Sequence, residues 1–350
     1  MFRETEVDGS VTFGVSHLDK NLNEICPDDE FPTEAEAQAR AEAEYGLRPE
    51  GWRDGPTRPE LLALAAAQAV ARDHGVACDE AVRMAGGSNV LVHLKPAPVV
   101  ARVMTGTAML HDDVEQWLAR EVAVGVFLAE RTAVAVPPSD LLPPGPHQRD
   151  GMWMTMWEFV DHDEQAPPPD PRELGESLRG LHAVLADYAG ALPPLSGIRD
   201  WLAGLLAELR PSPALTQQDI DWLGSELDAL TPAVFDSPLP AQALHGDVSL
   251  GNLLRTDHGL LWNDLEDVCR GAVAWDVAGL VASARMRGHG AEFVDEMLTA
   301  YGRVDDLEAF LDAHALYDVI WQAYDARRRP QAIERATASL ALLRERRAGS

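Results

Sequence analysis

The stretch LHGDVSLGNLL, residues 244–254, carries a carboxylate at Asp247 and a carboxamide at Asn252 between apolar neighbours. Burying two polar side chains costs free energy unless they have partners or a function. The chain continues LLRTDHGLLWNDLEDV, two short apolar runs around the turn signal TDHG, which predicts a hairpin ending at Asp264. Folding back in this way can bring Asp247, Asn252 and Asp264 toward one edge.

Side chains of these types suit phosphoryl transfer. Asn252 and Asp264 could supply the hard oxygen ligands that Mg²⁺ prefers, while phosphates and water complete its octahedron. Asp247 would then face an incoming hydroxyl, orient it and accept its proton. Taken alone, a His-Gly-Asp sequence is more often a simple turn, so the order of the other motifs along the chain decides between the two interpretations.

The ordered set resembles the aminoglycoside phosphotransferase and choline kinase family, which has the protein-kinase-like fold. Its catalytic loop, H-G-D-x-x-x-x-N, and its metal-binding segment, D-[FW]-E-D, match His245, Gly246, Asp247 and Asn252, and then Asp264, Leu265, Glu266 and Asp267. Leucine replaces the aromatic residue of the second motif. The segment GAVAWDVAGL is similar to the family's G-x-x-x-W-D-L-A, which implies that Asp276 is a structural carboxylate bracing the catalytic loop. The resemblance runs from about Ala85 to the C-terminus.

The nucleotide-binding parts of such a kinase are expected upstream. Gly86, Gly87 and Ser88 lie in a turn between β-like segments, where backbone N–H groups could approach an ATP phosphate, although a lone Gly-Gly-Ser is usually only a flexible loop. Where kinases carry a lysine paired with a helix glutamate, the strand VVARV offers Arg102, and Glu121 follows on the next helix. Arginine is a planar fork rather than a point charge, so phosphate binding would differ in detail. Arg102 and Glu121 could also be a surface pair.

The segment WMTMWEFVDHD resembles the family's inter-lobe hinge, where backbone groups of Glu158, Phe159 and Val160 would meet a purine edge. The resemblance therefore implies Mg²⁺ and ATP as cofactors, with GTP as the alternative nucleotide. It also implies an α+β bilobal fold, with a small, mainly β N-lobe that has one key helix and a larger, mainly helical C-lobe.

The elements that must position these residues follow from periodicity. The run 89–94 and the run 98–104 read as strands on either side of the turn KPAP, and residues 152–160 form another apolar run. Apolar residues at three- and four-residue spacing predict helices. The expected helices cover residues 32–46, 59–75, 112–130, 175–190, 198–210, 219–230, 291–302 and 307–328.

Three regions are expected from these patterns: an extension of unknown role over residues 1–57, an N-lobe over 58–164 and a C-lobe over 165–350. The proline-rich run QAPPPDP, residues 165–171, cannot continue a strand or a helix and marks the expected boundary between the lobes.

Composition narrows the function classes further. The chain has 350 residues and a formal net charge of −28, a field that repels phosphate backbones and acidic membrane surfaces. A nucleic-acid or membrane partner is therefore not expected. No apolar run is long enough to span a bilayer and the N-terminus does not resemble a signal peptide, so a cytoplasmic location is expected. The three cysteines lie far apart and are expected to be reduced thiols.

The acidic balance favours a cationic acceptor such as an aminoglycoside or another amino sugar, although acidity that only keeps the chain soluble is equally consistent with it. Side chains in the part of the chain that forms the family's acceptor pocket fit this interpretation, and each acid could equally be a solvated helix face. These candidates are Glu266, Asp267, Asp318, Trp321, Tyr324 and Asp325.

Two alternatives stay open at this level. A choline-type, homoserine-type or macrolide kinase would share every catalytic residue and differ only in its acceptor pocket. A kinase-fold binding module would keep the fold without catalysis, and Arg102 in place of lysine is the one feature that favours it. We expect a monomer or a homodimer. The sequence also predicts that His182 is a packed helix histidine and that tryptophans at helical spacing belong to the core.

Overall fold

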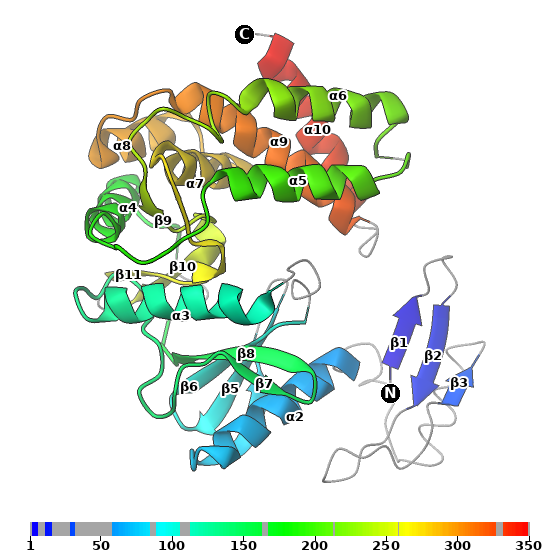
Figure 1. Ribbon diagram of the computed structural model, residues 1–350, viewed down its shortest axis with the longest axis vertical. Helices are drawn as coiled ribbons and strands as arrows, with labels where there is room; N and C mark the ends of the chain where they lie inside the picture. The colour runs from blue at the N-terminus through cyan, green and yellow to red at the C-terminus, as the bar shows by residue number, and fades with distance from the viewer. Residues whose placement is uncertain are drawn as a thin grey trace. The chain divides into compact units, whose positions relative to one another are not determined.

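The computed structural model describes residues 2–5, 11–15, 29–31, 58–84, 89–105, 113–162, 167–212, 214–257, 259–326 and 332–348. The expected helix over 32–46 and the glycine turn at Gly86, Gly87 and Ser88 lie outside the described residues. The chain divides into two compact units, one of residues 1–118 and 138–159 and the other of residues 119–137 and 160–350 (Figure 1). Among the described residues, no helix has the length and apolarity needed to cross a membrane.

The first unit is built on a five-stranded antiparallel sheet. Its strands follow the order β4-β5-β6-β8-β7, with β4 at Cys78–Arg83, β5 at Val90–Pro96, β6 at Val99–Val103, β7 at His147–Arg149 and β8 at Met152–Glu158. Helix α2, Arg58–Asp73, packs on one face of this sheet. Three short strands, β1 (Phe2–Thr5), β2 (Val11–Val15) and β3 (Asp29–Phe31), form a separate antiparallel sheet.

Alternation along β6 gives the sheet two different faces. Val99, Ala101 and Val103 are fully buried and pack with Ala63, Ala66 and other small residues of α2. Successive side chains of a strand point to opposite faces, so Val100 and Arg102 lie on the face away from α2. One face of the sheet therefore packs on α2, and Arg102 lies on the opposite face.

Helix α3, Val114–Ala129, begins in the first unit and ends in the second. Asp113 starts it, because its Oδ1 accepts a hydrogen bond from the backbone N–H of Gln116 at 2.9 Å.

The second unit is mainly helical. Its helices are α4 (Pro171–Leu185), α5 (Ser196–Glu208), α6 (Gln217–Leu230), α7 (Ala274–Met286), α8 (Ala291–Tyr301), α9 (Leu307–Asp325) and α10 (Ala332–Ala348). Two strand pairs lie among them: β9 (Gln242–Leu244) with β12 (Cys269–Gly271), and β10 (Leu253–Thr256) with β11 (Gly259–Trp262). The α+β architecture expected from the sequence, with a mainly β unit and a mainly helical unit, is confirmed.

Capping side chains mark the starts of two helices of this unit, α4 and α6. Asp170 accepts hydrogen bonds from the first backbone N–H groups of α4, and Pro171 occupies its first position. Thr216 and Asp219 form a capping box at the start of α6. Helix α7 was not expected as a separate element, because ten of its 13 residues are buried and it shows no amphipathic spacing. The C-terminal helix α10 was not expected either.

Candidate active site

The hairpin predicted from the sequence is present and positions two of the three candidate residues. Strands β10 and β11 pair in the register Leu253 with Trp262, and the backbone N–H of Asn263 donates to the carbonyl of Asn252 at 3.0 Å. Asn252 precedes β10 and Asp264 follows β11, so both lie at the same end of the hairpin. The Asn252 Nδ2 also donates to the Asp247 Oδ2 at 2.8 Å, which brings the catalytic-loop carboxylate to this end.

Asp264 has an unusual backbone conformation for a residue that is not glycine. Its φ is 62° and its ψ is 63°, in the left-handed region. A non-glycine residue held there costs about 1–3 kcal/mol and is found most often at functional sites. The turn ends the hairpin and starts the short helix η4, Leu265–Asp267.

The surroundings of Asp247 raise the pKa of its carboxyl. Burial raises the pKa of the Asp247 carboxyl, and the nearby Asp264 carboxylate raises it further. His245 and the hydrogen bond from Asn252 act in the opposite direction. A carboxylate with a raised pKa is a better proton acceptor than an ordinary aspartate, and two facing carboxylates of this kind are a suitable environment for a cation.

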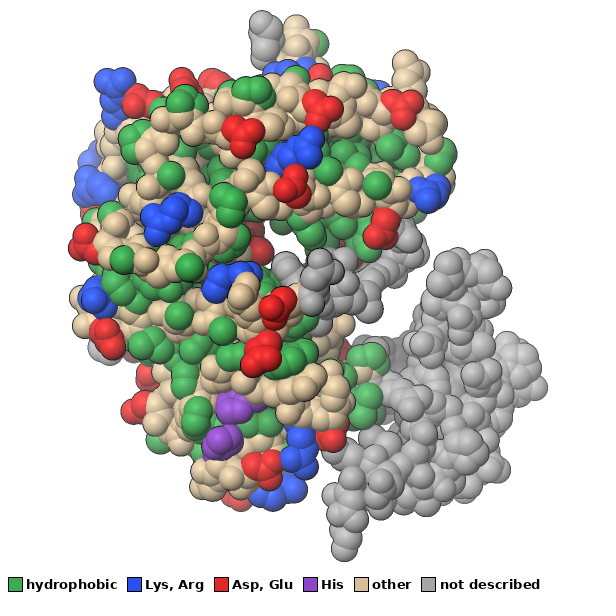
Figure 2. Space-filling view, viewed as in Figure 1, with side chains coloured by type: hydrophobic (Ala, Val, Ile, Leu, Met, Phe, Trp, Pro, Cys, Tyr) green, Lys and Arg blue, Asp and Glu red, His purple; other side chains and the backbone are tan. Residues whose placement is uncertain are grey.

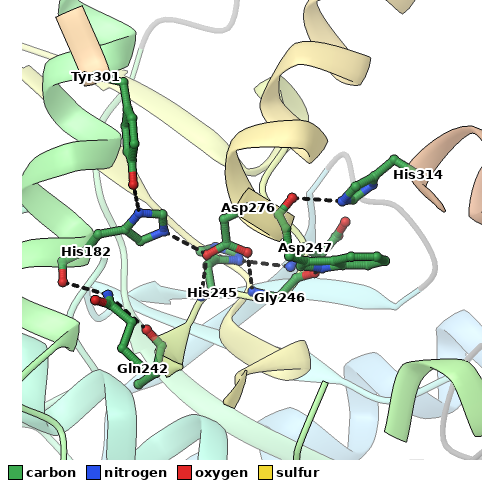
Figure 3. A network of polar contacts seen from close by, with 10 residues as sticks. His182, Gln242, His245, Gly246, Asp247, Asp276, Tyr301 and His314 are labelled. Atoms are coloured by element: carbon green, nitrogen blue, oxygen red, sulfur yellow. Dashed lines mark hydrogen bonds and ion pairs between the residues drawn. The ribbon is translucent and has the colours of Figure 1, made fainter. Parts of the chain in front are cut away.

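The catalytic loop is braced by Asp276 at the start of α7. Asp276 is fully buried, its Oδ2 accepts from the His245 N–H at 2.8 Å and its Oδ1 from the Gly246 N–H at 3.0 Å (Figure 3). Burial alone would raise the pKa of Asp276, but the hydrogen bond and charge of His182 and the nearby His245 hold it below its ordinary value. The structural role expected for Asp276 is confirmed.

Position 246 of the loop requires glycine, for two reasons. Its φ is +91°, and a Cβ atom there would overlap the backbone carbonyl of Asp267. Its carbonyl accepts from the Trp275 Nε1 at 2.7 Å, and His314 Nε2 lies 2.9 Å from the Trp275 carbonyl. The two residues before Asp247, His245 and Gly246, are thus hydrogen-bonded to Trp275 and Asp276 of α7.

The oxygen donors of Asn252 and Asp264 fit a hard divalent cation. No group of three or more His, Cys, Asp or Glu side chains that could hold a metal occurs in the part of the chain that the structure describes. One carboxamide and one carboxylate are too few ligands for a complete protein cage, but they match the way Mg²⁺ is usually bound together with nucleotide phosphates and water.

Arg102 and Glu121, the residues expected at the phosphates, are both buried. Arg102 lies on β6 between Leu91 of β5 and Thr155 of β8, with 5% of its surface exposed, and Glu121 lies on α3 with none. Burial of both groups does not suit an ordinary surface pair, since charged side chains are rarely buried without a partner. They belong to different compact units, and their pairing stays a prediction.

The segment expected to be the hinge is Glu158 to Val160, and the expected lobe boundary is the proline-rich run at 165–171. The first unit ends at Phe159 and the second resumes at Val160. The Phe159 N–H donates to the Pro98 carbonyl at 2.9 Å, and its ring stacks on His93 with a centroid distance of 3.9 Å. Glu158, the last residue of β8, is exposed. The purine contact expected here stays a prediction.

An acidic and aromatic group surrounds Tyr317 on α9. Burial raises the pKa of the Tyr317 hydroxyl, and so do four carboxylates near it: Asp247, Asp267, Asp318 and Glu266. The pKa of Asp318 is raised to about 7, first by burial and then by Asp247. Three of the acceptor candidates therefore share one environment with the candidate catalytic residue.

The ring of Trp201 on α5 completes this group and was not singled out in the sequence. Its centroid lies 5.7 Å from that of Tyr317 and 5.5 Å from that of Trp321. The sequence predicted that helical tryptophans belong to the core, yet Trp201 and Trp321 are only partly buried. Partial exposure and ring contacts mark these tryptophans as candidates for the site. Both features depend on the folded structure, and the sequence does not show them.

Comparisons with known proteins identify the family and the fold. The model of the phosphotransferase enzyme family, APH, matches residues 84–314, more than half of the chain. The structure is similar to amicoumacin kinase hAmiN in complex with AMP-PNP, Ca²⁺ and Ami, with a TM-score of 0.63 and 12% identity over 83% of this chain and 96% of that one. No curated protein matches the sequence.

Two further similar structures have other acceptors in their names. A choline/ethanolamine kinase family protein from Mesorhizobium loti has a TM-score of 0.55 and 17% identity over 80% of this chain and 94% of that one. The GDP complex of aminoglycoside 2'-phosphotransferase-IIIa has a TM-score of 0.54 and 15% identity over 83% and 99%. The structural likeness supports the fold, and the family match supports the chemistry: the chain belongs to the phosphotransferase enzyme family and is a small-molecule kinase.

Proposed function

We propose that this kinase transfers the γ-phosphoryl group of ATP or GTP to a hydroxyl of a small cationic molecule, such as an aminoglycoside or another amino sugar. The observation that carries this proposal is the group of carboxylates around Tyr317, which includes Asp247 itself. Overall acidity is weaker support, because Asp and Glu side chains are scattered among other types on the face in Figure 2 and form no single patch there.

Asp247 is the proposed catalytic residue. Its Oδ2 is held by Asn252, and among the described residues no other hydrogen bond to its carboxylate is formed, which leaves Oδ1 for the acceptor hydroxyl. The hydroxyl proton moves to Asp247 as the new O–P bond forms, and the bond to the nucleoside diphosphate leaving group breaks.

The carboxamide oxygen of Asn252 and the carboxylate of Asp264 are the proposed metal ligands. Bound Mg²⁺ would neutralise charge on the phosphate oxygens. Similar structures contain AMP-PNP with Ca²⁺, or GDP, which supports a nucleotide with a divalent cation, and the choice of Mg²⁺ belongs to the proposal. Arg102 would steady the phosphates.

Recognition of a cation would combine charge with aromatic faces. Asp318, Glu266 and Asp267 supply negative charge around Tyr317. The rings of Trp201, Tyr317 and Trp321 lie within 6 Å of one another in the pairs given above, and such faces attract ammonium groups, most strongly for tryptophan. The aromatic rings specifically favour a second candidate, a choline-type kinase whose acceptor is a quaternary ammonium alcohol.

A phosphate-transfer screen tests the proposal. Purified protein with Mg²⁺ and ATP or GTP is offered aminoglycosides, amino sugars, choline and macrolides, each paired where chemistry allows with a neutral partner: glucosamine with glucose, and choline with 3,3-dimethylbutanol. We expect transfer to a cationic member and at least ~10-fold lower kcat/KM for its neutral partner. Equal rates within the pairs would overturn the cationic acceptor, and transfer to no compound would favour a binding module.

The carboxylate at Asp318 offers a second, residue-level test. Asp318→Asn keeps the shape and removes the charge, so it should raise KM for the cationic acceptor and leave KM for ATP unchanged. Asp295→Asn, an exposed position on α8, is the matched control. An unchanged acceptor KM in Asp318→Asn would remove this residue from the acceptor site.

A further inference from the structure

The brace of the catalytic loop continues outward beyond Asp276. The Nε2 of His182 lies 3.0 Å from the Asp276 Oδ2, and its Nδ1 lies 2.7 Å from the hydroxyl oxygen of Tyr301 (Figure 3). Tyr301 is the last residue of α8, His182 belongs to α4 and Asp276 to α7. Three helices therefore meet in one chain of side chains that ends at the backbone of His245 and Gly246.

The ionisation of these groups determines how the hydrogen bonds of the series Tyr301–His182–Asp276 are made. Asp276 keeps a low pKa, so its carboxylate can only accept, and His182 must donate from Nε2. Burial and the Asp276 charge raise the pKa of the Tyr301 hydroxyl, so it stays a neutral hydroxyl that hydrogen-bonds Nδ1 of His182. Each group thus holds the next: Tyr301 orients the imidazole ring of His182, and His182 holds one oxygen of Asp276.

The close packing of α8 on α4 brings Tyr301 next to His182. A Cβ atom on Gly175 would overlap the Met297 carbonyl and come within 2.8 Å of the Tyr301 backbone nitrogen, so only glycine allows the two helices to approach this closely. Gly175 lies two turns before His182 on α4. On its other side, the His182 carbonyl accepts from the Gln242 Nε2 at 2.9 Å, just ahead of the catalytic loop.

We propose that His182 and Tyr301 are positioning residues for phosphoryl transfer, which hold Asp276 in the one rotation that binds both loop N–H groups and so aims Asp247. The Asp276 Oδ2 is shared by His182 and the His245 N–H, so removal of the imidazole frees the carboxylate to rotate away from the loop. The proposal rests on the role of Asp247 proposed above. Neither residue touches the acceptor or the nucleotide in this assignment.

Tyr301→Phe is the main test, because it removes one oxygen and keeps the ring. We expect kcat to fall roughly 3- to 10-fold, the effect of one buried hydrogen bond in a network, with KM for ATP and acceptor unchanged. Tyr188→Phe is the matched control, since Tyr188 is also partly buried and its ring packs on Phe127. Loss of thermal stability without a change in kcat would show a merely structural role and overturn the proposal.

His182 variants test the same step by graded replacement. His182→Leu removes both hydrogen bonds and should lower kcat by roughly 10- to 100-fold, the range for lost orienting partners. His182→Gln keeps an N–H donor for Asp276 and should recover part of that loss. In the His182→Leu background, Tyr301→Phe should have no further effect, because the two residues act in series. Full additivity would overturn the proposal.

Two measurements separate failure of this proposal from failure of the proposed function. If Asp247→Asn abolishes transfer while Tyr301→Phe and His182→Leu keep the wild-type kcat, the positioning role is wrong and the catalytic assignment stands. The second measurement is the hydrogen-exchange rate of the backbone amides of residues 245–247. It does not require a known acceptor, and it does not require that the His182→Leu variant folds. Exchange should be faster in Tyr301→Phe than in wild type and Tyr188→Phe, and equal exchange would again overturn the proposal.

Discussion

The side chain of Asn252 makes two hydrogen bonds to Asp247: its Nδ2 donates to the Asp247 Oδ2 at 2.8 Å and to the Asp247 carbonyl at 2.9 Å. The carboxamide nitrogen is thereby fully used, and the carboxamide oxygen is turned away from Asp247. One residue therefore orients the proposed base and presents an oxygen for a cation, which explains why a carboxamide rather than a carboxylate is suited to this position.

Replacement of Asp247 by asparagine should lower kcat by roughly the 10²–10⁴ that is typical of a lost general base. Nucleotide affinity, measured by isothermal titration with Mg·ATP, should stay close to the wild-type value, because Asp247 contacts the acceptor in this assignment. Near-normal turnover would remove Asp247 from the catalytic role.

Asn252→Ala and Asp264→Ala should both raise the Mg²⁺ concentration needed for half-maximal nucleotide binding. Asp264→Ala should have the larger effect, because it removes a charge as well as an oxygen. Titration of Mg²⁺ at fixed ATP measures the difference, and an unchanged Mg²⁺ dependence would exclude that residue as a ligand. Asn252→Ala should lower kcat as well, since it also releases Asp247.

Gly246→Ala should destabilise the second unit by at least ~2 kcal/mol, because it combines a positive φ with overlap on the Asp267 carbonyl. The control is Gly204→Ala in α5, where nothing lies within 4 Å of the new Cβ and alanine should stabilise the helix by about 0.5–1 kcal/mol. Urea unfolding compares them. Equal stability of the two variants would contradict the close approach at Gly246.

Asp318 makes stability depend on pH. Its pKa is about 7 in the folded state against an ordinary 3.8, so between these values the folded state binds the extra proton and stability falls as pH rises. Asp318→Asn removes this cost. Its stability gain over wild type should grow by about 2 kcal/mol from pH 5 to pH 7, after allowance for partial exposure, and level off about one pH unit above the folded-state pKa.

His314 acts in the opposite direction over an overlapping range. Burial lowers its pKa from 6.5 to about 4, so the unfolded state binds the extra proton and stability falls as pH decreases through this window. His314 is present in both forms compared above, so its contribution cancels in the difference. A pH-independent gain for Asp318→Asn would contradict the raised pKa of Asp318.

Arg102→Lys should raise the apparent constant for ATP by roughly 3- to 10-fold, with a smaller effect on the acceptor, because lysine keeps the charge and loses the bidentate contacts. Glu121→Ala should act in the same direction, and the double variant should lose less than the sum of the singles if the residues are paired. Strict additivity would argue against a direct pair, and an unaltered constant in Arg102→Ala would mean that another residue holds the phosphates.

Local patterns in the sequence predicted the hairpin next to Asp247 and several of the helices, while the bilobal fold was expected from the family resemblance. The spacing of Asp247 and Asn252 and the hairpin that returns the chain to Asp264 are short-range features, encoded within about twenty residues. Amphipathic spacing likewise predicted α4, α5, α6, α8 and α9, because each exposes one polar face to water. Helix α7 has no polar face, so its sequence shows no alternation of apolar and polar residues at helical spacing and did not predict a separate helix.

The tertiary structure alone decided which distant residues share an environment. Tyr301 and His182 are 119 residues apart, and His182 and Asp276 are 94 residues apart, so no local pattern relates them. The approach of Trp201 to Tyr317 and the raised pKa of Asp318 likewise depend on how α5 and α9 pack. Burial and the interaction of charges depend on how several helices pack together. Local patterns in one sequence do not show which distant helices will be neighbours.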